Sequence, residues 1–469
     1  MKSAQWGGPP GPRPTPSSAS VSSVIRLLTL ALAAHTLLPA ASVLLISIDG
    51  MRPDSVTRAD EHGLKIPNLR RFVAQGAYAE GVTGVTPTIT YPSHTTMITG
   101  VWPAEHGILG NLRFDPLLEN MAGWYWYATD IRVPTLWSAA GQAGMVVASE
   151  NWPASVGAPG VRYLIPEYWR ARTPDDRKLI EALSRPDGWL QELESKLGPY
   201  TNGNETTLSG DELRTRYAVE ILLTRKPGFM TLHLSSLDET EHETSPFSKQ
   251  SNEALEALDG MIGRLVAAAV HDNPGGVVAV VSDHGFVRTD YRVNLAIPFI
   301  EHGLAKLGKP ASDGAVTIES WEAEPWIAGS AAIMLRRPDD SAVRDRVKHM
   351  LTELAAKPEN GIARILDSEE VKKTGGFPGA AFLVELKPGY QFGGAFSGPL
   401  VTPAPSTGTH GYLPDRPEMR SSFFILGQGI TAGKNLGLID MRQIAPTLAS
   451  ILSVKLESAT QPVLAVSTK

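Results

Sequence analysis

The sequence predicts an α/β protein with a mostly parallel central sheet sandwiched between helices and a small α+β insertion. Three observations lead to this prediction. Short apolar runs recur along the chain, and several end in polar residues, as buried parallel strands do. Helical patterns with one apolar stripe lie between these runs. The pattern changes between residues 300 and 400, where weak strands flank a charged helix.

A short apolar run near the N-terminus predicts a targeting segment. Leu27–Leu38 follows Arg26, and the small residues Ala40, Ala41 and Ser42 suit signal-peptide cleavage. The run is shorter than the ~20 residues that span a bilayer. We therefore predict that residues 1–41 are a signal peptide, or else an N-terminal anchor, and that the protein is exported to a periplasmic or extracellular location. No other run in the sequence reaches membrane length.

The remaining chain alternates predicted strands and helices. The strands are predicted at Val43–Ile48, Met145–Ala148, Phe229–Leu234, Val277–Val281 and Phe423–Leu426. The helices are predicted at Asn68–Gln75, Ser251–Val270 and Ile439–Leu452, because apolar residues recur on one face of each. The weak strands Ala331–Leu335 and Ala381–Leu386 flank a helix at Ser341–Ala356. We divide the chain into a first core part (42–299), an inserted subdomain (300–400) and a second core part (401–469).

Composition narrows the possible chemistry. The chain has 469 residues, a net charge of −6 and no cysteine. Without a basic excess, binding of polymeric nucleic acid is not expected. Without cysteine, disulfide frameworks, thiolate metal sites and cysteine nucleophiles are excluded. Any bound metal must therefore be held by histidines and carboxylates.

Polar residues follow the predicted strands, where active sites of open α/β sheets lie. Three aspartates and three histidines occupy such positions: Asp49, Asp238, His242, Asp283, His284 and His410. The last of these stands just before another predicted strand. Each alone is also compatible with a turn or a surface position. Together, hard oxygen and imidazole ligands suit Zn²⁺, with Mn²⁺ or Fe as alternatives. Other histidines, among them His94, His106 and His233, are interpreted as structural or surface residues.

A hydroxyl-rich turn, Thr86–Met97, leads into a predicted helix with Pro92 in its first turn. Thr90 competes with neighbouring hydroxyls for the role of nucleophile. Ser93 is favoured as the helix cap, which leaves Thr90 upstream of the helix. A metal ion would lower the pKa of such a hydroxyl and activate it. Asn111 offers an amide that would either hold a phosphoryl oxygen or cap a turn.

Several short motifs occur in a fixed order between residues 43 and 450. They are Ser47-Ile48-Asp49-Gly50, Thr90-Tyr91-Pro92-Ser93-His94, Thr99-Gly100, His106-Gly107-Ile108 with Asn111, Trp152-Pro153, Asp238 with His242, Ser282-Asp283-His284-Gly285 and Gly408-Thr409-His410-Gly411. The ordered set resembles the nucleotide pyrophosphatase/phosphodiesterase group of the alkaline phosphatase superfamily. Many members carry a lysine before the threonine, where this chain has Ile89, so the preference for nucleotides is left open.

The resemblance implies an alkaline-phosphatase-like fold and a site with two Zn²⁺ ions. One ion would be bound by Asp238, His242 and His410, and the other by Asp49, Thr90, Asp283 and His284. Thr90 would attack phosphorus and form a phosphothreonine intermediate, and Asn111 would donate to a phosphoryl oxygen. Tyr91 matches an aromatic position that stacks on a nucleobase.

The implied activity is hydrolysis of a small-molecule phosphodiester or nucleotide pyrophosphate bond. A phosphomonoesterase or phosphonate hydrolase on the same two-metal site is the first alternative. A monoester dianion needs additional cationic donors, and no lysine lies between Lys65 and Lys178. A zinc-loaded binding protein without turnover is the second alternative, which the presence of Thr90 with all six ligands disfavours.

Overall fold

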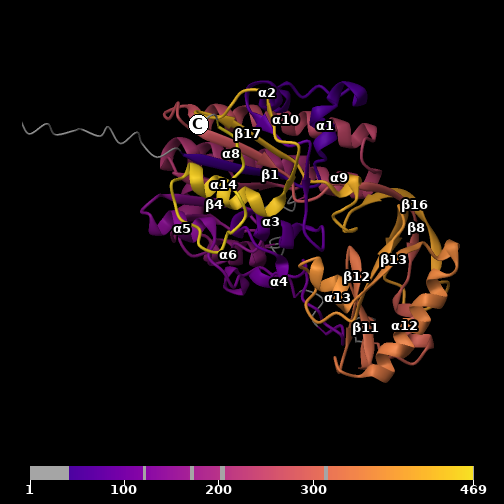
Figure 1. Cartoon of the computed structure of the whole chain (residues 1–469). Coiled ribbons are helices and arrows are strands. Elements are labelled where there is room, and N and C mark those ends of the chain that lie inside the picture. Colours follow the sequence, from indigo (N-terminus) through magenta and orange to yellow (C-terminus); the bar gives the residue numbers. More distant parts are fainter. Residues whose placement is uncertain (1–41, 120–122, 169–173, 201–205, 311–314, 468–469) are drawn as a thin grey trace, which may run out of the picture. The chain divides into compact units, whose positions relative to one another are not determined.

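The computed structural model describes residues 42–119, 123–168, 174–200, 206–310 and 315–467 (Figure 1). The predicted signal peptide or anchor, residues 1–41, lies outside the described residues. The described residues belong to one compact unit, Ala40–Lys469. No helix in this described part of the chain combines the length and the apolar character that a membrane crossing requires.

The large sheet contains eight strands among the described residues. Their order is β18 (Lys434–Asn435), β2 (Ala77–Tyr78), β17 (Phe423–Gly427), β7 (Val277–Val281), β1 (Val43–Ile48), β6 (Phe229–Leu234), β4 (Val147–Glu150) and β5 (Tyr163–Ile165). The five strands from β7 to β5 are mutually parallel, whereas β17 runs antiparallel to β7 and β2. The predicted mostly parallel sheet is therefore confirmed. The strand expected at Met145 begins later, at Val147.

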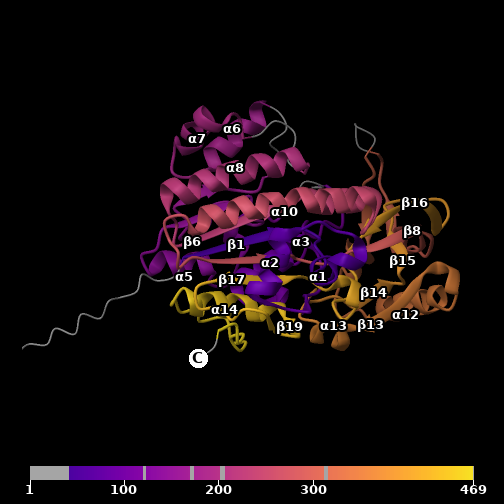
Figure 2. The same cartoon turned by 90° about the horizontal axis from the view of Figure 1, so that it is seen from above.

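Helices cover both faces of this sheet, because its side chains alternate between the two faces (Figure 2). From β1, Val43 and Leu45 pack with α3 (Thr90–Thr99), α5 (Leu136–Gln142) and α14 (Ile444–Ile451). Leu44, Ile46 and Ile48 pack toward the opposite layer. That layer contains α1 (Pro53–Thr57), α2 (Pro67–Gln75), α7 (Trp189–Leu197), α8 (Leu208–Arg225) and α10 (Lys249–Val270). Two hydrophobic cores therefore sandwich the sheet.

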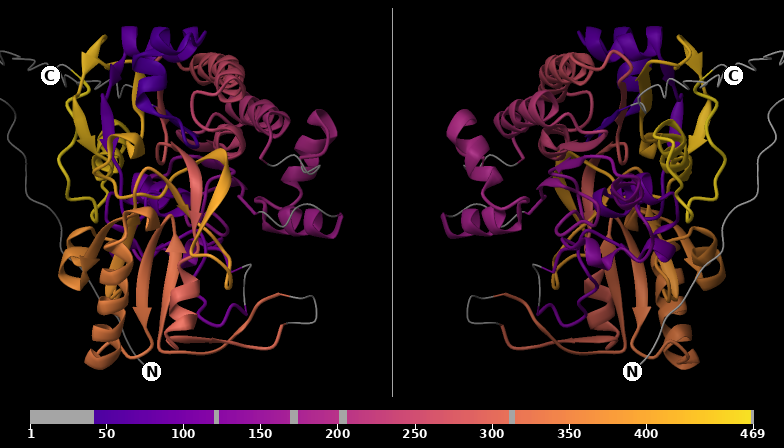
Figure 3. Two further views of the ribbon diagram at one scale, coloured as in Figure 1. Left: turned by 90° about the vertical axis from the view of Figure 1, so that its right-hand side faces the viewer. Right: turned by 90° about the vertical axis from the view of Figure 1, so that its left-hand side faces the viewer.

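A smaller sheet has the order β11 (Ala323–Ala328), β12 (Ser330–Leu335), β14 (Phe382–Leu386), β13 (Ile362–Asp367). Helix α12 (Ser341–Ala355) packs on one face, and the other face packs against Val371 of α13 (Ser368–Lys373) and Phe377 (Figure 3). These elements match the strands and helix expected between residues 300 and 400. The domain boundaries stay a prediction. One sheet crosses them, because β8 (Val287–Val293) of the first core part pairs with β15 (Gly389–Phe392) of the insertion and β16 (Val401–Thr409) of the second core part.

Two further expectations from the sequence, the start of the last helix and the place of His410, are wrong. The C-terminal helix does not start at Ile439, because Leu438–Asp440 form β19, which pairs with β3 (Gly81–Thr83), and the Asp440 side chain then caps a short 3₁₀ turn. His410 does not stand just before a strand; it follows β16 directly, and the next strand, β17, begins only at Phe423. The prolines Pro403 and Pro405 hide this strand in the sequence, and it is an edge strand, where proline is tolerated.

The remaining elements connect these layers. They are α4 (Pro103–His106), α6 (Pro174–Leu183), α9 (Ser236–Thr244), α11 (Ala296–Glu301), β9 (Ala305–Leu307) and β10 (Ile318–Trp321). Helix α9 follows β6 directly and so begins at the carboxyl edge of the large sheet. This edge carries the polar residues described next.

Candidate active site and metal centre

The six predicted metal ligands come together at the carboxyl edge of the large sheet. Asp49 follows β1, and Asp283 and His284 follow β7, the neighbouring parallel strand. Asp238 and His242 lie one helical turn apart on α9, as their spacing predicted. His410 reaches the same place from β16, and its ring stacks on that of His284 with centroids 3.6 Å apart.

The ligand atoms form two groups of metal-binding type. In the first, His242 Nε2 lies 3.5 Å from Asp238 Oδ2, and His410 Nε2 lies 3.6 Å from Asp238 Oδ1. In the second, His284 Nε2 lies 3.3 Å from Asp49 Oδ1 and 4.0 Å from Asp238 Oδ1. Asp238 thus belongs to both groups, whereas the resemblance assigned it to one ion. Asp283 Oδ2 lies 3.0 Å from His284 Nε2, beside the second group.

The three histidines present their Nε2 atoms to the site because their Nδ1 atoms face backbone carbonyls. His242 Nδ1 lies 3.2 Å from Gly408 O, His284 Nδ1 3.2 Å from Gly285 O, and His410 Nδ1 3.1 Å from Thr88 O. A carbonyl only accepts hydrogen bonds, so each Nδ1 carries the proton. In the neutral ring, Nε2 then has a lone pair for a metal ion.

Four buried polar atoms at this place fit a cation. Asp49 Oδ1, Asp238 Oδ1, Asp283 Oδ2 and His284 Nε2 are buried and make no well-oriented hydrogen bond among the described residues, although His284 Nε2 lies 3.0 Å from Asp283 Oδ2 and 3.3 Å from Asp49 Oδ1. Burying an unpaired charged group is costly unless a counter-charge or a metal ion compensates it. These residues therefore fit a divalent ion, since it would satisfy all four atoms at once.

The electrostatics also indicate excess negative charge. Burial and the neighbouring carboxylates of Asp283 and Asp238 raise the pKa of Asp49 well above its usual range. Burial opposes charge on Asp283 too, but the adjacent His284 outweighs this and holds the pKa of Asp283 well below its usual value. Burial lowers the pKa of His284, but Asp283 and Asp49 raise it by more, to about 9. Carboxylates packed this closely repel one another, and divalent cations would remove that repulsion.

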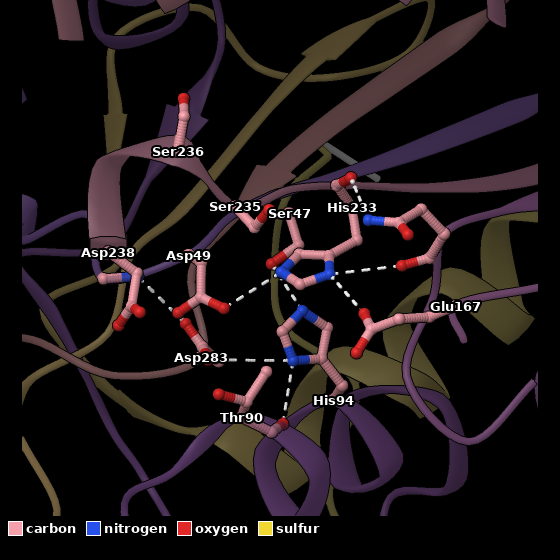
Figure 4. A network of polar contacts seen from close by, with 12 residues as sticks. Ser47, Asp49, Thr90, His94, Glu167, His233, Ser235, Ser236, Asp238 and Asp283 are labelled. Carbon is pink, nitrogen blue, oxygen red and sulfur yellow. Dashed lines mark hydrogen bonds and ion pairs between the residues drawn. The ribbon is translucent and has the colours of Figure 1, made fainter. Parts of the chain in front are cut away.

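Thr90 is the first residue of α3, so the predicted cap at Ser93 is wrong. The helix begins after Ile89, whose carbonyl accepts the Ser93 N–H at 3.2 Å. Pro92 fits in the first turn because the N–H groups there need no intrahelical acceptor. Figure 4 shows the Thr90 side chain next to the Asp283 carboxylate, on the side where Asp49 and Asp238 lie. The structure thus brings Thr90 to the metal-binding groups.

His94, one turn along α3, connects the start of this helix to Ser47 in β1. Its Nδ1 lies 2.8 Å from Thr90 O and its Nε2 2.8 Å from Ser47 Oγ (Figure 4). Burial and the nearby His233 lower the pKa of His94 to about 3, so the ring is neutral at physiological pH. The structural interpretation of His94 is therefore consistent with its contacts.

Asn111 contacts the same helix end. Its Oδ1 accepts the Tyr91 N–H at 3.0 Å, which satisfies one of the free donors of the first turn. With Oδ1 used in this way, the NH₂ end of the amide is the end that remains to donate. Of the two roles predicted from the sequence, the capping contact is present. It leaves the NH₂ end for the other role, donation to a phosphoryl oxygen, which stays a prediction.

Tyr91 has no exposed surface on which a nucleobase could stack. The ring packs in a cluster with Ile108, Tyr125 and Trp126. Its hydroxyl donates to Glu167 Oε1 at 2.7 Å. The structure therefore places Tyr91 in a packed cluster, and the base-stacking role that the resemblance implied stays a prediction.

Sequence reasoning missed two buried residues next to the ligands. His233 lies 3.0 Å from Asp49 Oδ2 through Nε2 and 2.9 Å from Glu167 Oε2 through Nδ1. Burial lowers the pKa of His233, but hydrogen bonds to Asp49 and Glu167 raise it by more, to about 10. A histidine within the apolar run of β6 was the available signal for this role. Glu167 has no such signal, because only the fold brings it to β6.

The comparisons with known proteins agree with this geometry. The family model described as type I phosphodiesterase / nucleotide pyrophosphatase matches residues 43–413. Human ectonucleotide pyrophosphatase/phosphodiesterase family member 1 is 26 % identical over 253 residues, which are 52 % of this chain and 23 % of the relative. A venom phosphodiesterase of Naja atra is 25 % identical over 254 residues, 52 % of this chain and 26 % of the relative. The match thus spans about a quarter of each of these relatives.

Solved structures show the same fold. Human and murine ectonucleotide pyrophosphatase/phosphodiesterase 5 superpose with a TM-score of 0.62 at 18 % identity, covering 90 % of this chain and 96 % of theirs. The murine protein of this comparison is an inactive variant in complex with AMP. At this identity the likeness shows the fold alone, a mostly parallel sheet sandwiched between helices.

Proposed function

The chain belongs to the type I phosphodiesterase / nucleotide pyrophosphatase family, and on this premise we propose that it hydrolyses phosphodiester or pyrophosphate bonds of small molecules, with Thr90 as nucleophile. The observation that supports this most directly is the convergence of four unpartnered buried ligand atoms beside the first residue of α3. A nucleophile placed next to cation ligands is the arrangement that phosphoryl transfer requires.

We propose that two divalent ions, preferably Zn²⁺, are held by six residues: Asp49, Asp238, His242, Asp283, His284 and His410. When bound, these ions would supply positive charge that lowers the pKa of the Thr90 hydroxyl and stabilises the oxygens around phosphorus. The carboxylates and neutral imidazoles suit zinc, and Mn²⁺ or Fe are the alternatives.

The protein's own groups then perform the reaction. Thr90 loses its proton to solvent and attacks phosphorus. The bond to the leaving oxygen breaks, this oxygen keeps the electron pair and takes up a proton from water, and a phosphothreonine ester forms. Asn111 donates from its amide NH₂ to a non-bridging oxygen. Water then hydrolyses the ester, which restores the Thr90 hydroxyl and releases the phosphate monoester.

We expect a diester to be favoured over a monoester because Arg113, the cationic residue nearest to Asn111 along the sequence, is already engaged. Arg113 pairs with Asp130 and lies 4.6 Å from the centroid of the Tyr125 ring. A monoester carries one more negative charge than a diester, and a cation bound elsewhere does not compensate it fully. A phosphomonoesterase or phosphonate hydrolase on the same site is the alternative.

The test uses the purified enzyme with bis-p-nitrophenyl phosphate and p-nitrophenyl phosphate, together with metal analysis. We expect two divalent ions per chain, faster hydrolysis of the diester and loss of activity on chelation. Thr90→Ala should lower kcat at least ~100-fold. The control is Thr99→Ala in the same helix, whose hydroxyl contacts only Thr95 O among the described residues and which should retain activity. Faster monoester hydrolysis would favour the alternative, and ligand binding unaffected by Thr90→Ala without turnover would indicate a binding protein.

We also propose that the protein is exported. The names of relatives as ecto-enzymes and venom proteins support this location. Fractionation of the producing cells tests it, since recovery of the protein in the cytoplasm alone would contradict export.

A further inference from the structure

Four buried side chains form a continuous series of hydrogen bonds from the residue after Thr90 to Asp49. Tyr91 donates to Glu167 Oε1 at 2.7 Å. Glu167 Oε2 lies 2.9 Å from His233 Nδ1, and His233 Nε2 lies 3.0 Å from Asp49 Oδ2 (Figure 4). None of these residues is more than 3 % exposed. We call Tyr91, Glu167 and His233 the tether.

The tether fixes which oxygen of Asp49 faces the metal-binding groups. His233 occupies Oδ2, and Oδ1 is the unpartnered atom 3.3 Å from His284 Nε2. When Glu167 and Asp49 are ionised, as for a metal ligand, both can only accept, so His233 donates from both ring nitrogens and holds them on opposite sides of one rigid plane. The Asp49 carboxylate therefore cannot rotate without breaking this contact.

The same series fixes the start of α3. Tyr91 is held at its hydroxyl by Glu167 and at its N–H by Asn111. Thr90 is the adjacent residue, so its position follows from that of Tyr91. The tether thus joins a proposed ligand on β1 to the proposed nucleophile through β6 and the segment after β5.

Packing alone does not account for these residue types. His233 stands in β6 between Leu232 and Leu234, which belong to the hydrophobic core. Buried ionisable groups that are paired are often no more stabilising than apolar residues of similar volume. A role in positioning gives a reason for a histidine and a glutamate at these places.

We propose that Tyr91, Glu167 and His233 are positioning residues, which set the distance between Thr90 and the ion held by the Asp49 group. This inference rests on the proposed function. It predicts a selective effect, because the hydrogen bonds described for the tether reach Asp49, whereas His242 and His410 of the other group contact Asp238.

The experiment compares Tyr91→Phe and Glu167→Gln with the wild-type holoenzyme. Tyr91→Phe removes only the hydroxyl, and Glu167→Gln keeps the shape of the side chain but removes its charge. Tyr217→Phe is the matched control, since Tyr217 is also fully buried and its hydroxyl donates to Gly198 O at 2.5 Å, outside the site. Zn²⁺ affinity is measured by chelator competition, in the wild-type and in a His242→Ala background that weakens the other group.

We expect Tyr91→Phe and Glu167→Gln to lower the affinity for one of the two Zn²⁺ ions by about 10-fold or more. They should also lower kcat for the diester by about 10-fold to 100-fold, with little change in KM. The weakened ion should be the one retained in the His242→Ala background. Tyr217→Phe should leave both affinities and kcat unchanged.

Wild-type affinities and kcat in Glu167→Gln would overturn the inference. An equal loss at both metal ions together with a lower Tm would also overturn it, because general destabilisation would then explain the result. These outcomes differ from a failure of the proposed function, in which the wild type itself would bind no metal or leave the diester intact.

Discussion

The amide of Asn111 connects backbone structure with chemistry through its two ends. Oδ1 satisfies the Tyr91 N–H at the start of α3, and the NH₂ end is proposed to donate to the substrate. The loop that carries it is shaped by His106, whose Nδ1 accepts the Ile108 N–H at 3.1 Å and whose Nε2 lies 3.0 Å from Thr96 Oγ1. Burial lowers the pKa of His106 to about 3, so this neutral arrangement persists at physiological pH.

Two substitutions of Asn111 separate its two roles. Asn111→Asp keeps an oxygen for the Tyr91 N–H but places a negative charge at the donor position, whereas Asn111→Ala removes both contacts. We expect kcat for the diester to fall ~100-fold in both variants. The free energy of unfolding should fall by about 1 kcal/mol only in Asn111→Ala. Steady-state kinetics and urea unfolding measure the two effects, and full activity in Asn111→Asp would contradict the donor role.

At this scale the sequence predicted the residues that follow apolar strands. Asp49, Asp283 and His284 stand directly after such runs, and this position is visible without a structure. Glu167 could not be found in this way, since nothing near it in the sequence shows that it faces His233. The burial of Tyr91 could not be predicted from the sequence either, because it depends on packing against Trp126 and Ile108.

Helix α9 holds two proposed ligands and depends on a neighbouring helix for its first turn. Asp211 of α8 accepts the N–H groups of Ser235 at 3.2 Å and Ser236 at 2.8 Å. Arg214 lies 2.6 Å from the same carboxylate, and both side chains are buried. Because Asp238 lies in this first turn of α9, this contact sets the direction in which α9 leaves β6.

Asp211→Asn should destabilise the protein and loosen the metal site. It removes the carboxylate charge that lies 2.6 Å from the buried Arg214, so we expect the free energy of unfolding to fall by about 3 kcal/mol. We also expect weaker Zn²⁺ binding at the group formed by Asp238, His242 and His410, measured by chelator competition.

A matched control exists on α10. Asp259 is also buried, and it accepts the Leu69 N–H at 2.7 Å and the Asn68 N–H at 3.2 Å at the start of α2, away from the site. Asp259→Asn should lower stability without changing Zn²⁺ affinity. If both variants weakened zinc binding equally, the specific role of Asp211 would be refuted.

Elements were predictable where local pattern alone determines them. The strands β1, β6 and β7 are continuous apolar runs and match the predicted bounds. By contrast, β19 exists because Ile439 pairs with Val82 far back in the chain. The local sequence there reads as the beginning of a helix, so the competing strand becomes visible only in the fold.

Across the whole molecule, the smaller sheet supports the loop that carries Asn111. Trp326 of β11 contacts Phe114 with ring centroids 5.6 Å apart, and both belong to one hydrophobic cluster with Leu109. A Cβ added at Gly110 would lie 3.2 Å from the Trp326 ring, so this contact is close. Residues 300–400 therefore influence the proposed oxyanion donor without supplying a metal ligand.

The contact between this sheet and the loop should make stability depend on pH. Burial and the Asp115 carboxylate raise the pKa of Glu324 on β11 from an ordinary value of 4.5 to about 7. Between these values the folded protein keeps this proton and the unfolded chain does not, so stability falls as pH rises through this window. Glu324→Gln should remove this loss. The free energy of unfolding of the variant minus that of the wild type should therefore be larger at about pH 8 than at about pH 5.

Urea unfolding at the two pH values measures this effect. The control is Glu301→Gln, a change at an exposed position at the end of α11. A difference between Glu324→Gln and the wild type that is the same at both pH values would contradict the assignment.

The positions of the ligands along the chain also determine when the centre can be completed. Asp49 ends the first strand, whereas His410 arrives only after β16 has paired with β8. A ribosome must therefore release most of the polypeptide before the last imidazole reaches its partners. Under the proposed function, the ions would be captured after synthesis, and under the proposed export the ion pool of the destination compartment, more than that of the cytosol, would select the bound element.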